Sequence, residues 1–188
     1  MKTKSFRSVS VLVAGLAACG VATAADYDEA IDGDLLSLAD GGTSFNLDVG
    51  TNSVTGTITA NPAGGLEEDF VTFTIGAGEA LTGVTLTNVV FTGGNTSTGF
   101  RLYTDQGTGF FQAASGSFGT ADVGVNYLTV WNLDDVGGSA PLGPGTYGVL
   151  LAEFTPGQEY SFDITVVPTP GVAAVIGLGG LAAMRRRA

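Results

Sequence analysis

Phe70-Val71-Thr72-Phe73-Thr74-Ile75 is the stretch that decides the fold. Its second, fourth and sixth residues are apolar and share one face of an extended chain, while two threonines lie on the opposite face. This alternation is typical of a half-buried antiparallel strand, with one side in a core and the other in solvent. Two further stretches repeat it with the inward residues Tyr147, Val149 and Leu151, and Tyr160, Phe162, Ile164 and Val166.

On both sides of this stretch, short runs rich in threonine, valine and phenylalanine alternate with glycine, asparagine and aspartate. We expect strands at 53–60, 70–75, 81–91, 100–104, 127–133, 145–151 and 160–167. No long amphipathic helix interrupts them. The pattern predicts an all-β domain over 26–167, an antiparallel, jelly-roll-like β-sandwich whose two sheets close on one core.

The predicted domain is strongly acidic. The whole chain has a formal charge of −11, but six of its seven basic residues lie near the two ends. Between 26 and 167 there are 18 carboxylates and one cation, Arg101, a formal charge of −17. Because nucleic-acid affinity depends on lysine and arginine displacing counterions, the composition excludes nucleic acid as a partner.

The residues of common catalytic mechanisms are also missing. The chain has no histidine, no lysine after Lys4, and a single cysteine, Cys19, inside the N-terminal apolar stretch. A neutral-pH imidazole base, a Schiff-base amine and a thiol nucleophile are therefore absent from the body. The sequence predicts a non-enzymatic domain.

The N-terminus has the pattern of a secretory signal peptide over 1–25. Lys2, Lys4 and Arg7 precede an apolar stretch over 9–18, which is too short to span a membrane stably. The small residues Ala22, Ala24 and Ala25 then fit signal peptidase, with cleavage after Ala24 or Ala25. We therefore expect the secretory translocon and signal peptidase as partners.

A second interpretation of this end is a lipobox. Leu16-Ala17-Ala18-Cys19-Gly20 would make Cys19 the lipidated mature N-terminus. Against it, the chain stays apolar through Ala22 and then offers the cleavage site, where a lipoprotein usually turns polar.

The C-terminus combines three features over 168–188. Pro168, Thr169 and Pro170 precede a glycine- and alanine-rich apolar stretch over 171–184, which ends at Arg185, Arg186 and Arg187. Together they resemble the PEP-CTERM sorting signal, which implies processing by an exosortase-like membrane protease. Thr169 stands where the family usually has glutamate, which leaves the processing enzyme open.

Helix geometry is compatible with this expectation. Fourteen apolar residues at about 1.5 Å each give roughly 21 Å of helix, short of the ~30 Å hydrocarbon core. Snorkelling arginines and local thinning would let such a short transmembrane helix cross, with the three arginines cytoplasmic. The alternatives are an anchor that is never cut and an apolar helix buried in the domain.

The body itself is similar to bacterial pre-peptidase C-terminal domains. The stretches at 67–78, 100–103, 143–149 and 160–164 follow that family's order, and the glycine-proline turn before Tyr147 is the most specific part. The resemblance implies a jelly-roll-like sandwich appended to secreted proteins, which binds or spaces other parts rather than catalysing.

The acidic residues form two groups in which oxygen ligands could converge on Ca²⁺ outside the cell. Their spacing fits neither an EF-hand loop nor a nonapeptide repeat. A solvated acidic surface is therefore the simpler interpretation, and no metal site is assigned. The residues concerned are Asp26, Asp28, Glu29, Asp32 and Asp34, and Glu67, Glu68 and Asp69.

Trp131, Tyr127, Phe110 and Phe111 could form a sugar-stacking platform, but aromatic residues at strand spacing belong more often to a core. We thus expect an exported protein, tethered in transit, of the cell envelope or extracellular matrix. The alternatives are a calcium-dependent carbohydrate-binding module that recognises extracellular polysaccharide, and a small surface glycosidase with paired carboxylates.

Overall fold

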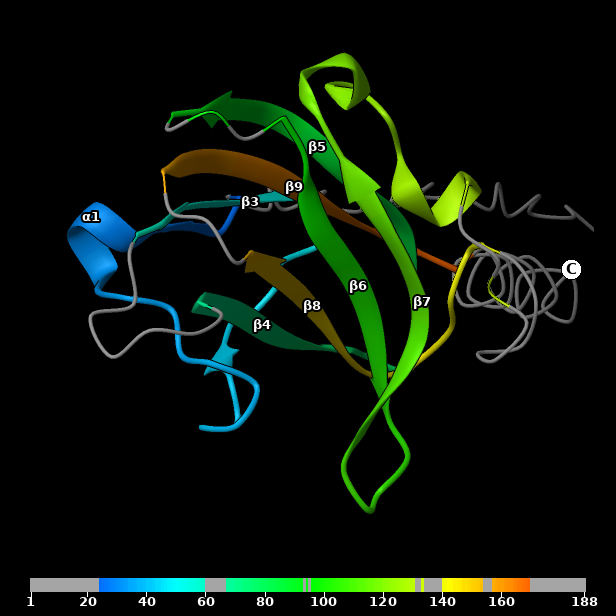
Figure 1. Cartoon of the computed structure of the whole chain (residues 1–188). Helices are drawn as coiled ribbons and strands as arrows, with labels where there is room; N and C mark the ends of the chain where they lie inside the picture. Colours follow the sequence, from blue (N-terminus) through cyan, green and yellow to red (C-terminus); the bar gives the residue numbers. More distant parts are fainter. Residues whose placement is uncertain are drawn as a thin grey trace, which may run out of the picture.

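The structure is a computed structural model that describes residues 24–59, 67–92, 94, 96–130, 133, 140–153 and 157–169. Within these residues the chain forms two β-sheets packed face to face as a sandwich (Figure 1). The predicted β-sandwich is therefore confirmed.

The first sheet has the strand order β1-β3-β9-β5. Strand β9 lies at its centre and pairs antiparallel with β3 on one side and β5 on the other. The strands are β1 (Asp26–Asp28), β3 (Gly50–Ile58), β9 (Gln158–Pro168) and β5 (Glu79–Phe91).

The second sheet has the order β2-β4-β8-β6-β7. From β4 to β7 its neighbours are antiparallel. The strands are β2 (Thr43–Ser44), β4 (Glu67–Ile75), β8 (Gly145–Glu153), β6 (Thr98–Asp105) and β7 (Phe110–Phe118).

Both sheets are mixed, so the prediction of a purely antiparallel sandwich was wrong at two edges. The short strand β1 runs parallel to β3, and the shorter β2 runs parallel to β4. The reason is the path of the chain, which leaves β1 through helix α1 (Glu29–Asp32), crosses to the second sheet at β2 and returns to the first at β3. Such a crossover brings neighbouring strands together in the same direction.

The core lies between the sheets, and the alternating faces predicted from the sequence form it. Val71, Phe73 and Ile75 are at most 2 % exposed, and so are the inward residues of β9 from Tyr160 to Val166. The ring centroids of Phe100 on β6 and Phe162 on β9 lie 6.0 Å apart across the sandwich. One apolar cluster therefore joins both sheets.

The strand predicted at 127–133 is wrong over its described residues. Tyr127–Thr129 form the short 3₁₀ helix η2, whose first residue is preceded by Asn126. The Asn126 side chain accepts hydrogen bonds from the backbone N–H groups of Leu128 and Val84 and donates one to the Thr82 carbonyl. This amide starts the helix and fixes the segment to the edge of β5, so tertiary contacts override the alternating pattern.

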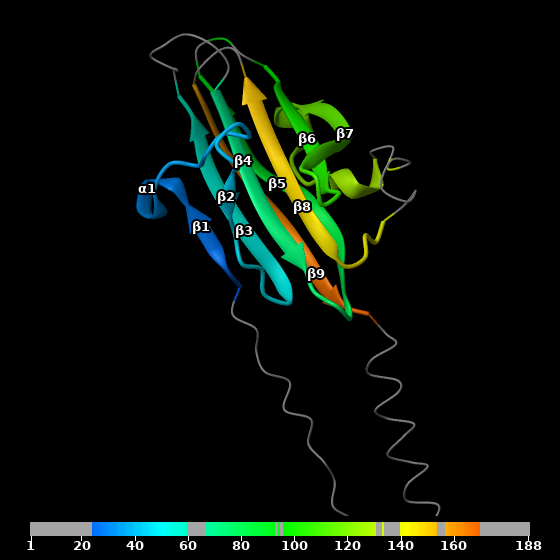
Figure 2. The same ribbon diagram turned by 90° about the horizontal axis from the view of Figure 1, so that it is seen from below.

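The two ends of the described chain leave the sandwich at the same end (Figure 2). Ala25 accepts a hydrogen bond from Ser53 near the start of β3, and Thr169 donates one to the Gly78 carbonyl before β5. Strand β9 thus includes Pro168, the first residue of the predicted sorting motif. The rest of the tail and residues 1–23 lie outside the described part of the chain. Among the described residues, no helix has the length and hydropathy of a membrane span.

Candidate carboxylate site

Three carboxylates meet at the side of the sandwich, where α1 passes the first sheet. Glu29 comes from α1, Asp34 from the segment that follows it, and Asp69 from β4 of the second sheet. One oxygen of each lies within 4.8 Å of the others. The cluster therefore brings together α1 and a strand of the second sheet, whose residues Glu29 and Asp69 are 40 positions apart in the sequence.

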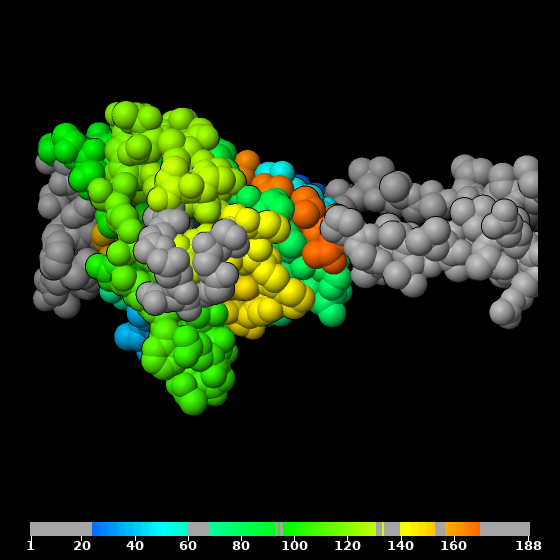
Figure 3. All heavy atoms as spheres, turned by 90° about the vertical axis from the view of Figure 1, so that its right-hand side faces the viewer, coloured from blue at the N-terminus to red at the C-terminus, as the bar shows by residue number. Residues whose placement is uncertain are grey.

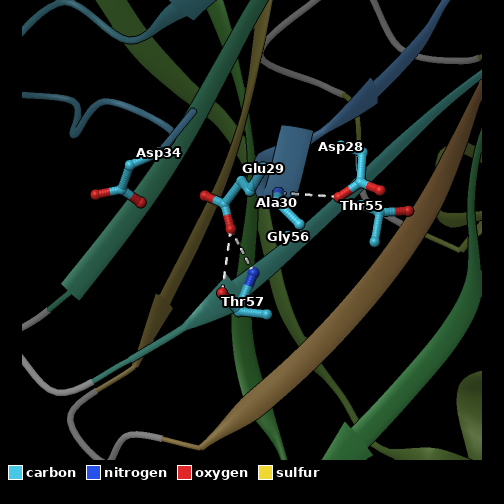
Figure 4. Close-up of a pocket in the computed structure, with 7 residues that line it drawn as sticks. All are labelled: Asp28, Glu29, Ala30, Asp34, Thr55, Gly56 and Thr57. Carbon is cyan, nitrogen blue, oxygen red and sulfur yellow. Dashed lines mark hydrogen bonds between the residues drawn. The ribbon is translucent and has the colours of Figure 1, made fainter. Parts of the chain in front are cut away.

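Local sequence explains why Glu29 and Asp34 lie together. The Asp28 side chain caps α1 by accepting a hydrogen bond from the Ala30 N–H at 3.0 Å (Figure 4). Gly33 then ends the helix with a φ of 105°, a conformation that glycine adopts without strain. The turn brings the chain back, so that Asp34 faces the same region as Glu29.

Asp69 is the buried member of the cluster, with 1 % of its surface exposed. It points inward from β4, and the hydroxyl of Tyr160 on β9 donates a hydrogen bond of 2.7 Å to its Oδ2. This bond crosses the sandwich from one sheet to the other. Burial raises the pKa of Tyr160 well above 10, and the nearby charge of Asp69 adds to the effect, so the phenol keeps its proton.

Glu29 is half-buried and held by the backbone. Its Oε1 accepts the N–H of Leu35 at 2.9 Å and its Oε2 accepts the N–H of Thr57 (Figure 4). Burial raises the pKa of the Glu29 carboxyl above its ordinary value of 4.5, the two backbone hydrogen bonds lower it, and the charge of Asp34 raises it. The net direction is upward, so desolvation exceeds the stabilisation from the hydrogen bonds.

Gly56 on β3 makes room for the cluster. A methyl group at this position would overlap the Tyr160 hydroxyl and would lie 2.9 Å from Glu29 Oε2. Any larger residue would therefore displace the two side chains that connect the cluster to the sheets.

A pocket of about 190 Å³ opens next to the cluster. It is smaller than the roughly 300–1,000 Å³ of typical small-molecule sites, so it suits an ion with its water or one small polar group. The lining residues, drawn as sticks in Figure 4, are Asp28, Glu29, Ala30, Asp34, Thr55, Gly56 and Thr57.

Hard oxygen ligands of this kind suit Ca²⁺. The three carboxylates would supply only part of the six to eight oxygens that Ca²⁺ takes. Glu29 and Asp69 already accept hydrogen bonds from the protein, so Asp34, which is exposed, is the carboxylate with most freedom to bind an ion.

The structure separates the acidic residues grouped by sequence. Asp34 and Asp69 join Glu29, whereas Asp32 accepts the N–H of Asp28 and Asp26 lies in β1. Glu68 alternates with Asp69 on β4 and so points away from the core, while the side chain of Glu67 lies outside the described part. The prediction of a solvated surface is wrong for Asp69, which is buried.

Two partners of the cluster, Tyr160 and Gly56, were not found from the sequence. Asp69 and Tyr160 are 91 residues apart, and Tyr160 has the same alternating pattern as any core residue of β9. No local motif marks such a bond. An acidic residue at an inward position of a strand, as Asp69 is, was the one available signal.

The predicted aromatic platform does not form from the residues that the structure describes. Tyr127 is 4 % exposed, with its ring centroid 4.9 Å from that of Phe100, and the centroid of Phe110 lies 5.0 Å from that of Phe70. Phe111 is exposed. The expectation that these aromatics belong to the core is confirmed for Tyr127 and wrong for Phe111. Phe110 is half-buried against a separate cluster around Phe70, and Trp131 lies outside the described residues.

A second pocket of about 370 Å³ lies at the end of the sandwich opposite the termini, lined in part by Thr57, Thr92 and Gln158. Gln158 is 2 % exposed, and neither atom of its amide has a hydrogen-bond partner. Since both amide atoms are shielded from solvent, a ligand in the open part of the pocket would not reach them.

Comparison with known proteins gives no further identification. No protein-family model matches the chain, and no curated protein matches it in sequence.

Proposed function

We propose that this chain is an exported, non-enzymatic protein of the cell envelope or extracellular matrix, which reaches its destination through a PEP-CTERM-like tail. The proposal rests on the tail sequence, in which Pro168-Thr169-Pro170, an apolar stretch and three arginines follow one another. An exosortase-like protease would cut the tail, and the sandwich would be the part that remains.

The position of the junction is compatible with this proposal. The last strand ends at Pro168, and the Thr169 N–H donates to the Gly78 carbonyl at 2.8 Å. The folded body therefore reaches the first two residues of the motif. If the tail only directs sorting, no linker is needed between the folded domain and the motif.

The N-terminal junction supports a cut after Ala24. The Ala25 N–H donates to Asn52 Oδ1, and its carbonyl accepts from the Ser53 N–H. A cut after Ala24 keeps both bonds, whereas a cut after Ala25 removes them. We therefore expect the mature chain to begin at Ala25.

Composition supports a non-enzymatic role for the body. Without histidine, lysine or cysteine after residue 25, the domain depends on carboxylates and hydroxyls for any proton transfer. A jelly-roll-like sandwich of the pre-peptidase C-terminal kind, which binds or spaces other parts, is the finer description that we propose for it.

Intact mass of the protein isolated from its producing cell tests the proposal. We expect a chain that begins at Ala25 and ends within the predicted motif, near Pro170. A mass that includes residues 171–188 would contradict processing, and a lipid on Cys19 would contradict the predicted N-terminus.

Replacing Arg185, Arg186 and Arg187 together with glutamine tests the tail itself. We expect loss of membrane retention and of processing, because the cytoplasmic charges that fix the helix are gone. Arg101→Gln, which removes the one cation of the body, is the control and should leave localisation unchanged. Normal localisation of the triple variant would contradict a role for the arginines.

A calcium-dependent carbohydrate-binding module is the second candidate, favoured by the carboxylate cluster. Three acidic groups converge there, and Arg101, the one basic residue between 25 and 169, lies two strands from β4. A Ca²⁺ titration of thermal unfolding, with Asp34→Asn as the variant, separates the candidates. A midpoint that does not change with Ca²⁺ or chelator would rule this function out.

A further inference from the structure

Three of the four sheet edges are short or covered among the described strands. Two of these edges are formed by very short strands: β1 has three residues and β2 has two. The third edge, β5, is covered by the segment after β7, since Leu86 exchanges hydrogen bonds with Val125 and Gly124, and Leu81 with Leu142. Very short edge strands and covered edges are the usual means by which proteins prevent strands from adding to a sheet.

Strand β7 is the exception. It is nine residues long and pairs with β6 on one side, and no described segment pairs with its other side. It has no proline, no lysine and no other charged residue. Figure 3 looks onto this side of the molecule, where the green and lime hairpin of β6 and β7 lies at the surface and its tip extends from the body.

Within β7, one half is regular and the other is not. Tyr103 pairs with Gln112 and Leu102 with Ala114, so Ala113 is the extra residue of a β-bulge, which bends the edge there. The five residues from Ala114 to Phe118 pair in continuous register with β6. Ser115, Gly116 and Ser117 are exposed and small, so another strand could approach closely.

Charge favours a second copy of this chain as the strand that adds. The region 106–121 has no ionisable side chain, and β6 contributes Arg101 and Asp105, so the hairpin has no net charge. Arg101 is the cross-strand partner of Ser115. The net charge of −17 between 26 and 167 therefore comes from residues outside this hairpin. Because the hairpin itself is neutral, two copies would repel each other least when they meet at β7.

We propose that two copies of this chain pair through the outer edges of β7, antiparallel over Ala114–Phe118, and so join their five-stranded sheets into one. The backbone N–H and C=O groups of each edge supply the bonds for the other. The interface is isologous, as a two-fold dimer requires.

Disulfide cross-linking of the full chain tests the pairing. In a Cys19→Ala background the introduced cysteine is the only thiol, because the sequence has no other. We would compare Ser115→Cys alone, Ser117→Cys alone, their mixture, and Thr51→Cys as the control on an exposed position of the other sheet. Under mild oxidation, the mixture should form covalent dimers more readily than either variant alone, because Ser115 of one copy lies opposite Ser117 of the other in the proposed pairing.

A charge variant supplies the second measurement. In the proposed pairing Ser117 of one copy lies opposite Ser115 of the other, so the double variant Ser115→Asp/Ser117→Asp places like charges opposite each other. It should raise the dissociation constant of the dimer about tenfold or more, measured by sedimentation. Thr51→Asp should leave it unchanged, and circular dichroism shows that both variants are folded.

Three results would overturn the proposal. One is a wild-type chain that sediments as a monomer up to about 0.1 mM. Another is cross-linking of Thr51→Cys as strong as that of the β7 variants. The third is a dimer that Ser115→Asp/Ser117→Asp leaves unchanged, since it would be formed by another surface such as the tail.

Discussion

At the scale of single residues, the bond between Tyr160 and Asp69 has one of the largest predicted energetic effects. A buried carboxylate that loses its donor pays a desolvation penalty that water cannot compensate. Asp69 is 1 % exposed, and the bond to Tyr160 connects the two sheets. The Tyr160 hydroxyl therefore contributes to stability by solvating a buried carboxylate and by joining the sheets.

Tyr160→Phe should lower the free energy of unfolding by about 1.5–3 kcal/mol, the range for a hydrogen bond to a charged group. Tyr147→Phe is the matched control, since its hydroxyl donates to the neutral Gly143 carbonyl and should cost only about 0.5–1.5 kcal/mol. Urea unfolding in the presence of chelator measures both. Equal losses would mean that the buried carboxylate does not depend on Tyr160.

Gly56→Ala should destabilise the domain, because the new methyl group overlaps the Tyr160 hydroxyl. Overpacking of this kind costs about 1–3 kcal/mol. Gly143→Ala provides the comparison, since a methyl group there meets no atom within 4 Å. The idea fails if both variants unfold at the same urea concentration.

The raised pKa of Glu29 predicts how stability depends on pH. Because the folded state holds this proton more tightly than the unfolded state, the contribution of Glu29 is complete below its ordinary pKa of 4.5 and is lost as pH rises through the folded-state pKa. Glu29→Gln does not titrate. The wild type should lose stability relative to this variant as pH rises from about 4 to 8 in chelator, and parallel curves would contradict the raised pKa.

At the scale of elements, sequence alternation predicted the strands that face the core and failed at the segment after β7. Six of the seven expected strands overlap β3, β4, β5, β6, β8 and β9, because inward apolar residues impose a period of two. Residues 127–129 share that period but form η2, since Asn126 bonds to β5. Strand β7 has small residues from Ala113 to Ser117 in place of alternating large apolar ones, so it gave no such signal.

Asn126→Ala tests this attachment. It removes the bonds from Asn126 to Val84 and Thr82, and we expect a loss of about 1–3 kcal/mol in unfolding free energy. Hydrogen exchange of the β5 amides should become faster. Asn88→Ala, at an exposed position of the same strand, is the control; equal exchange in both variants would show that Asn126 does not protect the edge.

The candidate site was only partly predictable at this scale. Sequence placed acidic residues near both 26–34 and 67–69, but three of them meet only because α1 packs against β3 of the first sheet, next to the inward-pointing Asp69 of β4. That contact depends on the crossover from β1 to β2, which the prediction of a purely antiparallel fold did not include. Long-range topology, rather than residue type, was the missing information.

At the scale of the whole molecule, the boundary of the folded body can be tested by shortening the chain. A variant that ends at Thr169 should unfold at the same urea concentration as the full chain, because it keeps the bond to Gly78. A variant that ends at Thr165 loses Val166, which is 2 % exposed, and should be less stable by about 1.5–3 kcal/mol. If the Thr169 variant is already unfolded, residues 170–188 contribute to the fold.

The shared exit of the two ends has a consequence for engineering. A module whose first and last residues emerge together can be grafted into a surface turn of an unrelated carrier without separating the flanking parts of that carrier. Residues 25–169 would then form a cassette, with the far tips of β3, β5 and β8 held outward. Those tips are where new recognition loops would be built.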